Sequence, residues 1–144
     1  MNRKEIEGDI STERIENGTE LMIDFEKLKK VAQCETPVIP VAVQDEKTKD
    51  ILIIAYANEE ALRYTLEHKE AAFWSTSRNK LWVKGKTSGD VLKVTDVYVN
   101  CDQNSLVYKV NMVGQGSCHV KDEEGRTRFG CYYRKVSGDG LEFV

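Results

Sequence analysis

The alternation of apolar and polar residues predicts a chain built mainly from antiparallel β-strands. Residues 41–44 and 51–57 are rich in β-branched and apolar side chains on either side of a polar stretch, so they predict a β-hairpin. Residues 91–99 and 106–113 alternate between apolar and polar positions and predict a second antiparallel pair. The polar residues 100–104 would form the turn of this second pair.

Helical spacing is present in two short segments. Apolar residues three to four positions apart predict a helix over residues 21–32, which the prolines that follow would end. A second helix is predicted to begin after Asn58, whose side chain suits the N-cap position, and to end near His68. We interpret His68 as a solvated residue at the helix C-terminus rather than as a catalytic group. The buried face of this helix is expected to consist of Ala61, Leu62, Thr65 and Leu66.

The remaining segments complete a predicted fold of the α+β class. Strands are expected at residues 71–75, 81–83 and 129–134, and the last of these carries Cys131. The charged residues 121–128 predict an exposed turn, and the chain is expected to end in a tail. The fold is therefore expected to contain mainly antiparallel strands and two short helices.

Composition and charge indicate one globular domain with a separate N-terminal extension. The chain has 144 residues, is 40% hydrophobic and carries a net charge of −3, which gives no reason to expect bulk affinity for nucleic acid or anionic membranes. Residues 1–20 are rich in acids and contain two glycines, so we predict a variable, flexible extension, with a partner-binding arm as the alternative. Residues 21–144 are expected to form a single domain.

The sequence favours a cytoplasmic location. No apolar run approaches the ~20 residues of a membrane span, and the N-terminus lacks the apolar core of a signal peptide. In a reducing cytoplasm the four cysteines are expected to be free thiols or metal ligands rather than disulfides.

A loop at residues 84–90 combines glycines, hydroxyl side chains and lysines in a chain that is acidic overall. Glycine lets successive backbone N–H groups converge on an anion, and Ser and Thr side chains add further donors. The loop is therefore a candidate phosphate-binding site. An ordinary basic hairpin loop would explain the same composition.

Three cysteines form a candidate metal site. Sixteen residues separate Cys101 from Cys118 and twelve separate Cys118 from Cys131, so the spacing is not that of a zinc ribbon or finger. Three protein ligands with an open fourth position are typical of catalytic zinc, which lowers the pKa of bound water to about 7. Buried apolar cysteines are the alternative. His119 follows Cys118 directly and favours catalysis, because a histidine near a metal can move protons. We interpret Cys34 as a structural thiol.

The combination and order of motifs over residues 37–134 closely resemble the phosphoribosyl-AMP cyclohydrolase family of histidine biosynthesis, and residues 1–20 lie outside the match. The matching segments are 43–45, 55–62, 73–75, 77–78, 81–89, Cys101-Asp102, Cys118-His119 and 131–134. This resemblance implies an enzyme that opens the purine ring of phosphoribosyl-AMP between N1 and C6 by hydrolysis.

The resemblance also implies a site. Zinc would be bound by Cys101, Cys118 and Cys131 in an intertwined homodimer whose subunits share each metal site. Zinc-bound hydroxide would attack C6, and His119 would move protons to and from the ring nitrogen. The residues expected to bind a phosphate or ribose end of the substrate are Arg78, Lys84, Thr87, Ser88 and Gly89.

The chain departs from the family pattern around Cys101. The family usually has three aspartates that bind magnesium, whereas the corresponding residues here are Asn100, Asp102 and Asn104. Mg²⁺ is a hard cation that is held mainly through carboxylates and retained waters. We therefore predict weak or absent magnesium dependence. The stretch between Cys118 and Cys131 is also longer than is usual in the family.

Two alternative functions follow from the same residues. The substituted Asn100 and Asn104 could indicate a divergent zinc hydrolase or deaminase that acts on another purine-like nucleotide. A non-catalytic dimer, stabilised by zinc and binding nucleotides, is an alternative of a different class. His119 beside Cys118 speaks against this second alternative, because a structural zinc site needs no proton carrier.

Overall fold

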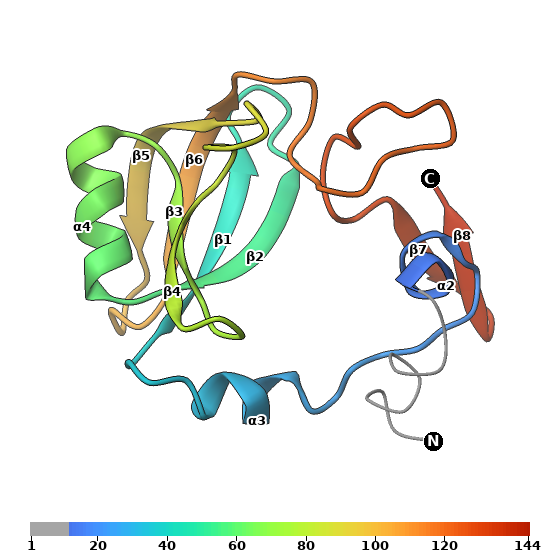
Figure 1. The fold of residues 1–144 in the computed structure, drawn as a ribbon, viewed down its shortest axis with the longest axis horizontal. Coiled ribbons are helices and arrows are strands. Elements are labelled where there is room, and N and C mark those ends of the chain that lie inside the picture. Colours follow the sequence, from blue (N-terminus) through green and yellow to red (C-terminus); the bar gives the residue numbers. More distant parts are fainter. Residues whose placement is uncertain (1–11) are drawn as a thin grey trace.

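The computed structural model describes residues 12–144, and its arrangement is drawn in Figure 1. The helices are α2 (Thr12–Asn17), α3 (Lys27–Ala32) and α4 (Glu59–His68). The strands are β1 (Ile39–Asp45), β2 (Ile51–Ala57), β3 (Ala72–Ser75), β4 (Lys80–Val83), β5 (Leu92–Val99), β6 (Leu106–Met112), β7 (Arg134–Ser137) and β8 (Gly140–Phe143).

A four-stranded sheet with the strand order β2-β1-β6-β5 forms the centre of the molecule. The β1–β2 and β5–β6 pairs are antiparallel, and β1 runs parallel to β6. Helix α4 and the β3–β4 hairpin cover one face of this sheet (Figure 1). The predicted α+β class with mostly antiparallel strands is therefore confirmed, as are the two predicted pairs.

The core lies between the sheet and its cover. Val41 and Val43 on β1 and Tyr108 and Val110 on β6 are fully buried, and they alternate with more accessible residues along each strand. Successive side chains of a strand point to opposite faces, so this alternation buries one face of the sheet. Phe73 on β3 stacks on Tyr108 with ring centroids 5.7 Å apart.

Helix α4 begins as its sequence predicts. The Asn58 side-chain oxygen accepts the backbone N–H of Ala61 at 2.9 Å, which satisfies one of the unpaired donors of the first turn. Ala61 and Thr65 form its buried face, and Leu62 is partly buried. Leu66 was predicted to belong to this face, but its side chain is 47% exposed.

Other predicted elements were wrong. The helix expected over 21–32 is confined to α3, and Phe25 is 90% exposed, so the apolar spacing does not mark a buried face. The strand expected over 129–134 is irregular up to residue 133, and only Arg134 belongs to a strand, as the first residue of β7. The expected tail is instead the β7–β8 hairpin, whose tight turn contains Gly138 at φ 58. The structure also describes three helices rather than two.

The segment from residue 12 to residue 20 lies against the C-terminal hairpin (Figure 1). Glu20 forms an isolated β-bridge with Gly140, and the Tyr133 hydroxyl donates to the carbonyl oxygen of Glu16 at 2.6 Å. The predicted flexibility of residues 1–20 stays a prediction, since residues 1–11 lie outside the described part of the chain. Within residues 12–144, every helix is too short or too polar to cross a membrane.

Candidate active site

A cleft of about 350 Å³ brings the candidate chemistry of several loops together. We call it the thiol cleft, and its polar lining consists of Lys84, Lys86, Thr87, Ser88, Asp90, Ser117, Cys118, His119, Lys121, Thr127 and Cys131. The loop between β4 and β5 and the long loop between β6 and β7 both contribute to it. Residues that are distant in sequence therefore meet at one place.

Cys118 and Cys131 are neighbours in this cleft. Cys118 is buried, and the backbone N–H of Cys131 donates to the carbonyl oxygen of Leu52 at 2.8 Å, which fixes the second thiol beside β2. A hydrogen bond from the Cys131 thiol lowers the pKa of Cys118 to about 6, and the backbone N–H of Val120 acts in the same direction, while burial opposes both. The same thiol–thiol bond raises the pKa of Cys131.

Lys84 is a buried cation next to these thiols. Its ammonium group donates to the backbone carbonyl oxygen of Asp90 at 3.3 Å. Burial lowers the pKa of Lys84, whereas the charges of Asp90, Cys131 and Cys118 oppose that shift. Gly85 adopts φ 80, and a Cβ at this position would collide with the backbone of Asp90. The loop can therefore fold back over Lys84 only because residue 85 is glycine.

His119 lies at the exposed mouth of the thiol cleft. Its side chain is 82% exposed, and its Nε2 lies 2.8 Å from a carboxylate oxygen of Glu16 on α2. Sequence reasoning did not identify Glu16, because an acidic extension gives no signal of which side chain reaches a distant histidine. Lys121 and Thr127 were also missed as lining residues, and they are joined by an isolated β-bridge.

Cys101 lies at the opposite end of the main sheet from the other two cysteines. It occupies the β5–β6 turn, whereas Cys131 is held beside the start of β2, and the registers of β1 with β2 and β6 place these positions at opposite ends. Figure 1 shows the turn below the sheet and the loop after β6 above it. Cys101 precedes β6 and Cys118 follows it, so the seven residues of this strand lie between them.

No three His, Cys, Asp or Glu side chains within residues 12–144 are close enough to hold one metal ion. The single chain thus brings Cys118 and Cys131 together but leaves Cys101 apart. All four cysteines are free thiols.

The predicted substrate-binding residues also lie in two separate places. Lys84, Thr87 and Ser88 line the thiol cleft, and Gly89 continues their loop without lining it. Arg78 lines a separate cavity of about 250 Å³ at the β3–β4 turn.

The predicted magnesium residues form a closed polar turn. The side-chain oxygen of Asn100 accepts the backbone N–H groups of Asn104 and Ser105, each at 2.9 Å. Its amide group donates to Asn104 Oδ1 at 2.6 Å. Asp102 is exposed at the tip of this turn.

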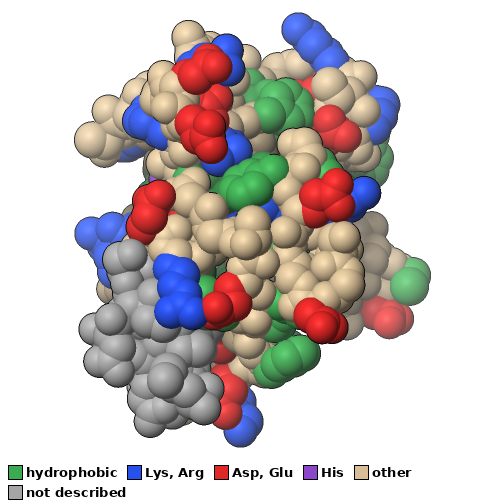
Figure 2. Space-filling view, turned by 90° about the vertical axis from the view of Figure 1, so that its right-hand side faces the viewer, with side chains coloured by type: hydrophobic (Ala, Val, Ile, Leu, Met, Phe, Trp, Pro, Cys, Tyr) green, Lys and Arg blue, Asp and Glu red, His purple; other side chains and the backbone are tan. Residues whose placement is uncertain are grey.

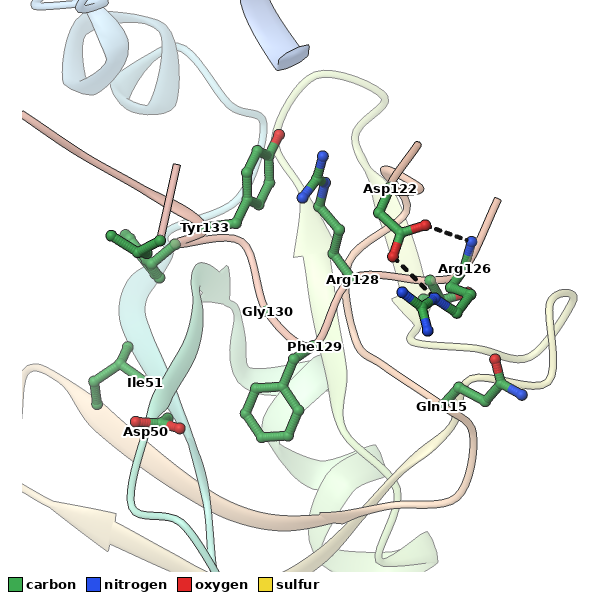
Figure 3. Close-up of a pocket in the computed structure, with 12 residues that line it drawn as sticks. Asp50, Ile51, Gln115, Asp122, Arg126, Arg128, Phe129, Gly130 and Tyr133 are labelled. Atoms are coloured by element: carbon green, nitrogen blue, oxygen red, sulfur yellow. Dashed lines mark hydrogen bonds and ion pairs between the residues drawn. The ribbon is translucent and has the colours of Figure 1, made fainter. Parts of the chain in front are cut away.

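A second, larger cleft of about 780 Å³ is lined largely by the loop that joins Cys118 to Cys131 (Figure 3). Within it, the guanidinium group of Arg128 lies 4.2 Å from the ring centroid of Tyr133. Asp122 holds the tip of the loop through hydrogen bonds to Arg126, which Figure 3 shows as dashed lines. On the side of the molecule that carries the C-terminal hairpin, apolar side chains interrupt the charged surface (Figure 2).

The fold and the thiol cleft together define a class of protein. Paired thiols, an exposed histidine and a loop of lysines and hydroxyl groups surround one cleft in an α+β fold. Such a cleft suits an enzyme that binds an anionic substrate.

Comparison with known proteins identifies the family. The sequence signature described as phosphoribosyl-AMP cyclohydrolase matches residues 53–133, more than half of the chain. Phosphoribosyl-AMP cyclohydrolase of Chlorobium phaeovibrioides is 43% identical over 118 residues, which cover 82% of this chain and 81% of that protein. The Archaeoglobus fulgidus protein of the same name is 45% identical over 105 residues, covering 73% and 91%. The histidine biosynthesis bifunctional protein HisIE of Aquifex aeolicus is 39% identical over 108 residues, covering 75% and 50%.

The chain belongs to the phosphoribosyl-AMP cyclohydrolase family. The family predicted from the sequence motifs, and the prediction of an enzyme, are therefore confirmed.

Proposed function

We propose that this protein opens the purine ring of phosphoribosyl-AMP by hydrolysis, as a step of histidine biosynthesis. The observation that carries this proposal is the meeting of Cys118, Cys131 and His119 with the 84–88 loop in one cleft, largely within the segment that matches the family. In the reaction, water adds to C6 and the N1–C6 bond breaks. C6 becomes a carboxamide carbon, and N1, which keeps its phosphoribosyl group, receives a proton.

The residues of the thiol cleft fit part of a zinc site. Two adjacent thiols are soft donors of the kind that zinc prefers, and the lowered pKa of Cys118 favours its thiolate form. Within residues 12–144, no third His, Cys, Asp or Glu side chain of the same chain lies close enough to complete the site. We infer that Cys101 of a second subunit completes the site in a homodimer. Bound zinc would supply an activated water at neutral pH.

The residues of the cleft have separate roles in this proposal. Lys84, Thr87 and Ser88 would bind a phosphate group of the substrate, since they present a cation and two hydroxyl groups on one side of the cleft. Arg78 and Gly89 do not line the thiol cleft of their own chain, so any role for Arg78 would be in the second subunit's site.

His119 would move protons between water and the leaving ring nitrogen. Its exposed position at the mouth of the cleft leaves it free to meet the substrate. An imidazole titrates near neutral pH, and it can therefore act as both base and acid in one reaction cycle.

Magnesium is not required in this proposal. The side chains of Asn100 and Asn104 are hydrogen-bonded to each other, and Asp102 is the sole carboxylate of residues 100–104. One carboxylate with neutral amides is a poor site for Mg²⁺. A cytoplasmic location remains our expectation from the sequence.

The proposal is tested by incubating the zinc-loaded protein with phosphoribosyl-AMP and measuring the ring-opened formimino product. We expect turnover that His119→Ala reduces by about a hundredfold or more. His68→Ala is the matched control, because His68 bonds to Tyr64 far from the cleft and its loss should leave turnover unchanged. Turnover of another purine nucleotide alone would indicate a divergent hydrolase. Tight nucleotide binding without any turnover would indicate a binding protein.

A further inference from the structure

We propose that Glu16, in the N-terminal segment, is a positioning residue that fixes the tautomer and the orientation of the His119 imidazole. Its role in catalysis rests on the proposed function, whereas the pairing itself does not. Glu16 lies outside the segment that matches the family, residues 53–133, so the family match does not predict it.

The pairing is close and well placed. His119 Nε2 lies 2.8 Å from Glu16 Oε2, across 103 positions of sequence. The Glu16 side chain is 26% exposed and the His119 side chain 82% exposed, so the carboxylate contacts the ring from the protein side. Most of the imidazole therefore remains exposed when it bonds to Glu16.

Glu16 is held in place through its backbone. The Tyr133 hydroxyl donates to the Glu16 carbonyl oxygen at 2.6 Å, and Arg134 donates to the carbonyl oxygen of Gly18 at 2.9 Å. Leu141 N–H donates to Thr19 O at 2.8 Å, so three bonds join this segment to residues 133–141. Tyr133 and Arg134 closely follow Cys131. The chain segment that carries one thiol therefore also anchors the carboxylate that contacts His119.

The partner of each ring nitrogen determines the tautomer. A carboxylate only accepts, so the neutral ring of His119 must carry its proton on Nε2 when it bonds to Glu16. Nδ1 then keeps its lone pair and is free to accept a proton from water or to return one to the leaving nitrogen. A carboxylate that orients a histidine in this way is the general logic of base–orienter pairs in hydrolases.

His68 serves as an internal reference for the tautomer measurement, because its other ring nitrogen, Nδ1, makes the hydrogen bond. Its Nδ1 lies 3.1 Å from the backbone carbonyl oxygen of Tyr64, which also can only accept. The two histidines of the chain are therefore expected to be opposite tautomers, His68 with its proton on Nδ1 and His119 with its proton on Nε2.

The direct test is a long-range ¹H–¹⁵N spectrum of the zinc-loaded, ¹⁵N-labelled protein. It is recorded at an alkaline pH at which the ring ¹⁵N shifts themselves show that both imidazoles are neutral. We expect the Nε2–H tautomer for His119 in the wild type and in Glu16→Gln, whose amide oxygen still accepts. In Glu16→Ala we expect a mixture of tautomers for His119 and an unchanged spectrum for His68. An Nδ1–H tautomer of His119 in the wild type would overturn the proposal.

The kinetic test uses the same proteins. Loss of a second-layer partner of this kind typically costs about 10–100-fold, so we expect Glu16→Ala to lower kcat at least about tenfold. KM should stay within about twofold, because Glu16 does not line the cleft that binds substrate. Glu16→Gln should restore part of kcat. The matched control is Glu13→Gln on the same helix, where Glu13 bonds to Asn17 instead of to the histidine.

The outcomes separate the two proposals. Unchanged kcat in Glu16→Ala would overturn the positioning role. A loss of kcat in Glu13→Gln equal to that in Glu16→Ala would also overturn it, because the effect would then come from the helix. If the wild type had no activity on phosphoribosyl-AMP, the proposed function would fail, and the spectra would still decide whether Glu16 sets the tautomer of His119.

Discussion

The Asn100 amide group donates to Asn104 Oδ1 at 2.6 Å, so the turn that carries Cys101 is closed by one asparagine bonding to another. The Asn100 oxygen also accepts the backbone N–H groups of Asn104 and Ser105. A carboxylate at residue 100 would keep these acceptor bonds but lose the donor. The two amides thus hold the turn together at the positions where the family usually has magnesium ligands.

We predict that Asn100→Asp combined with Asn104→Asp destabilises the protein and makes it respond to magnesium. Two carboxylates at this separation repel each other by about 1 kcal/mol in water, and a bound cation would remove that cost. The melting temperature should fall without divalent cations and recover in the presence of Mg²⁺. Titration calorimetry should show tighter Mg²⁺ binding than in the wild type.

The single variant Asn104→Asp is the control for this experiment. Its carboxylate can still accept from the Asn100 amide, so its melting temperature should stay close to that of the wild type. A double variant whose stability and Mg²⁺ affinity equal those of the wild type would show that the turn is not a latent magnesium site.

A shared zinc site predicts complementation between inactive variants. Cys101→Ser and Cys118→Ser should each lose zinc and activity. If the two are mixed, unfolded and refolded together, half of the dimers should pair one chain of each kind. One of the two sites in such a dimer combines intact Cys101 with intact Cys118 and Cys131. Activity should therefore return to about a quarter of the wild-type value.

The matched control mixes Cys118→Ser with Cys131→Ser. These two cysteines are neighbours in one chain, so every site in the mixture lacks one of them and no activity should return. Absence of recovery in the first mixture, or equal recovery in both, would contradict a site that takes Cys101 from the second subunit.

Thr65→Val should destabilise the fold without changing the residues that line the thiol cleft. Thr65 is fully buried, and its hydroxyl donates to Ala61 O at 3.0 Å while accepting the N–H of Ala72 at 3.0 Å. Valine leaves that buried N–H unpaired, which costs about 1–3 kcal/mol. Urea unfolding should report this loss. Thr65→Ser retains the hydroxyl and should lose less. A loss in Thr65→Ser equal to or larger than that in Thr65→Val would show that the hydroxyl contributes no more to stability than the methyl group does.

The loop between Cys118 and Cys131 should open in acid. The backbone N–H of Arg126 lowers the pKa of Asp122 most, and the N–H of Glu124 and the Arg126 guanidinium act in the same direction. Because the folded pKa lies below the ordinary value of 3.8, the stabilisation is complete above that value and is lost as pH falls through the folded pKa.

Amide chemical shifts of Glu124 and Arg126, followed from pH 5 down to about pH 2, would measure this transition. In Asp122→Asn the transition assigned to Asp122 should disappear from the Arg126 amide, whose N–H no longer bonds to a carboxylate. A wild-type midpoint at or above the ordinary carboxyl value would contradict the prediction.

The sequence by itself determined the local elements and the family. The β-branched composition of residues 41–44 and the alternation over residues 106–113 predicted β1 and β6 as strands, because a strand repeats every two residues whatever lies around it. Asn58 identified the start of α4, since an N-cap acts within three residues. The order of Cys101, Cys118-His119 and Cys131 identified the family, because those motifs carry the chemistry themselves.

Only the tertiary structure decided which of these residues meet. The parallel register of β1 with β6 separates Cys101 from Cys118 and Cys131, and no local pattern encodes that register. The contact of Glu16 with His119 spans 103 positions and depends on the β7–β8 hairpin that the sequence did not predict. Local propensity acts over a few residues, whereas the composition of this site depends on strand pairing and on the packing of distant segments.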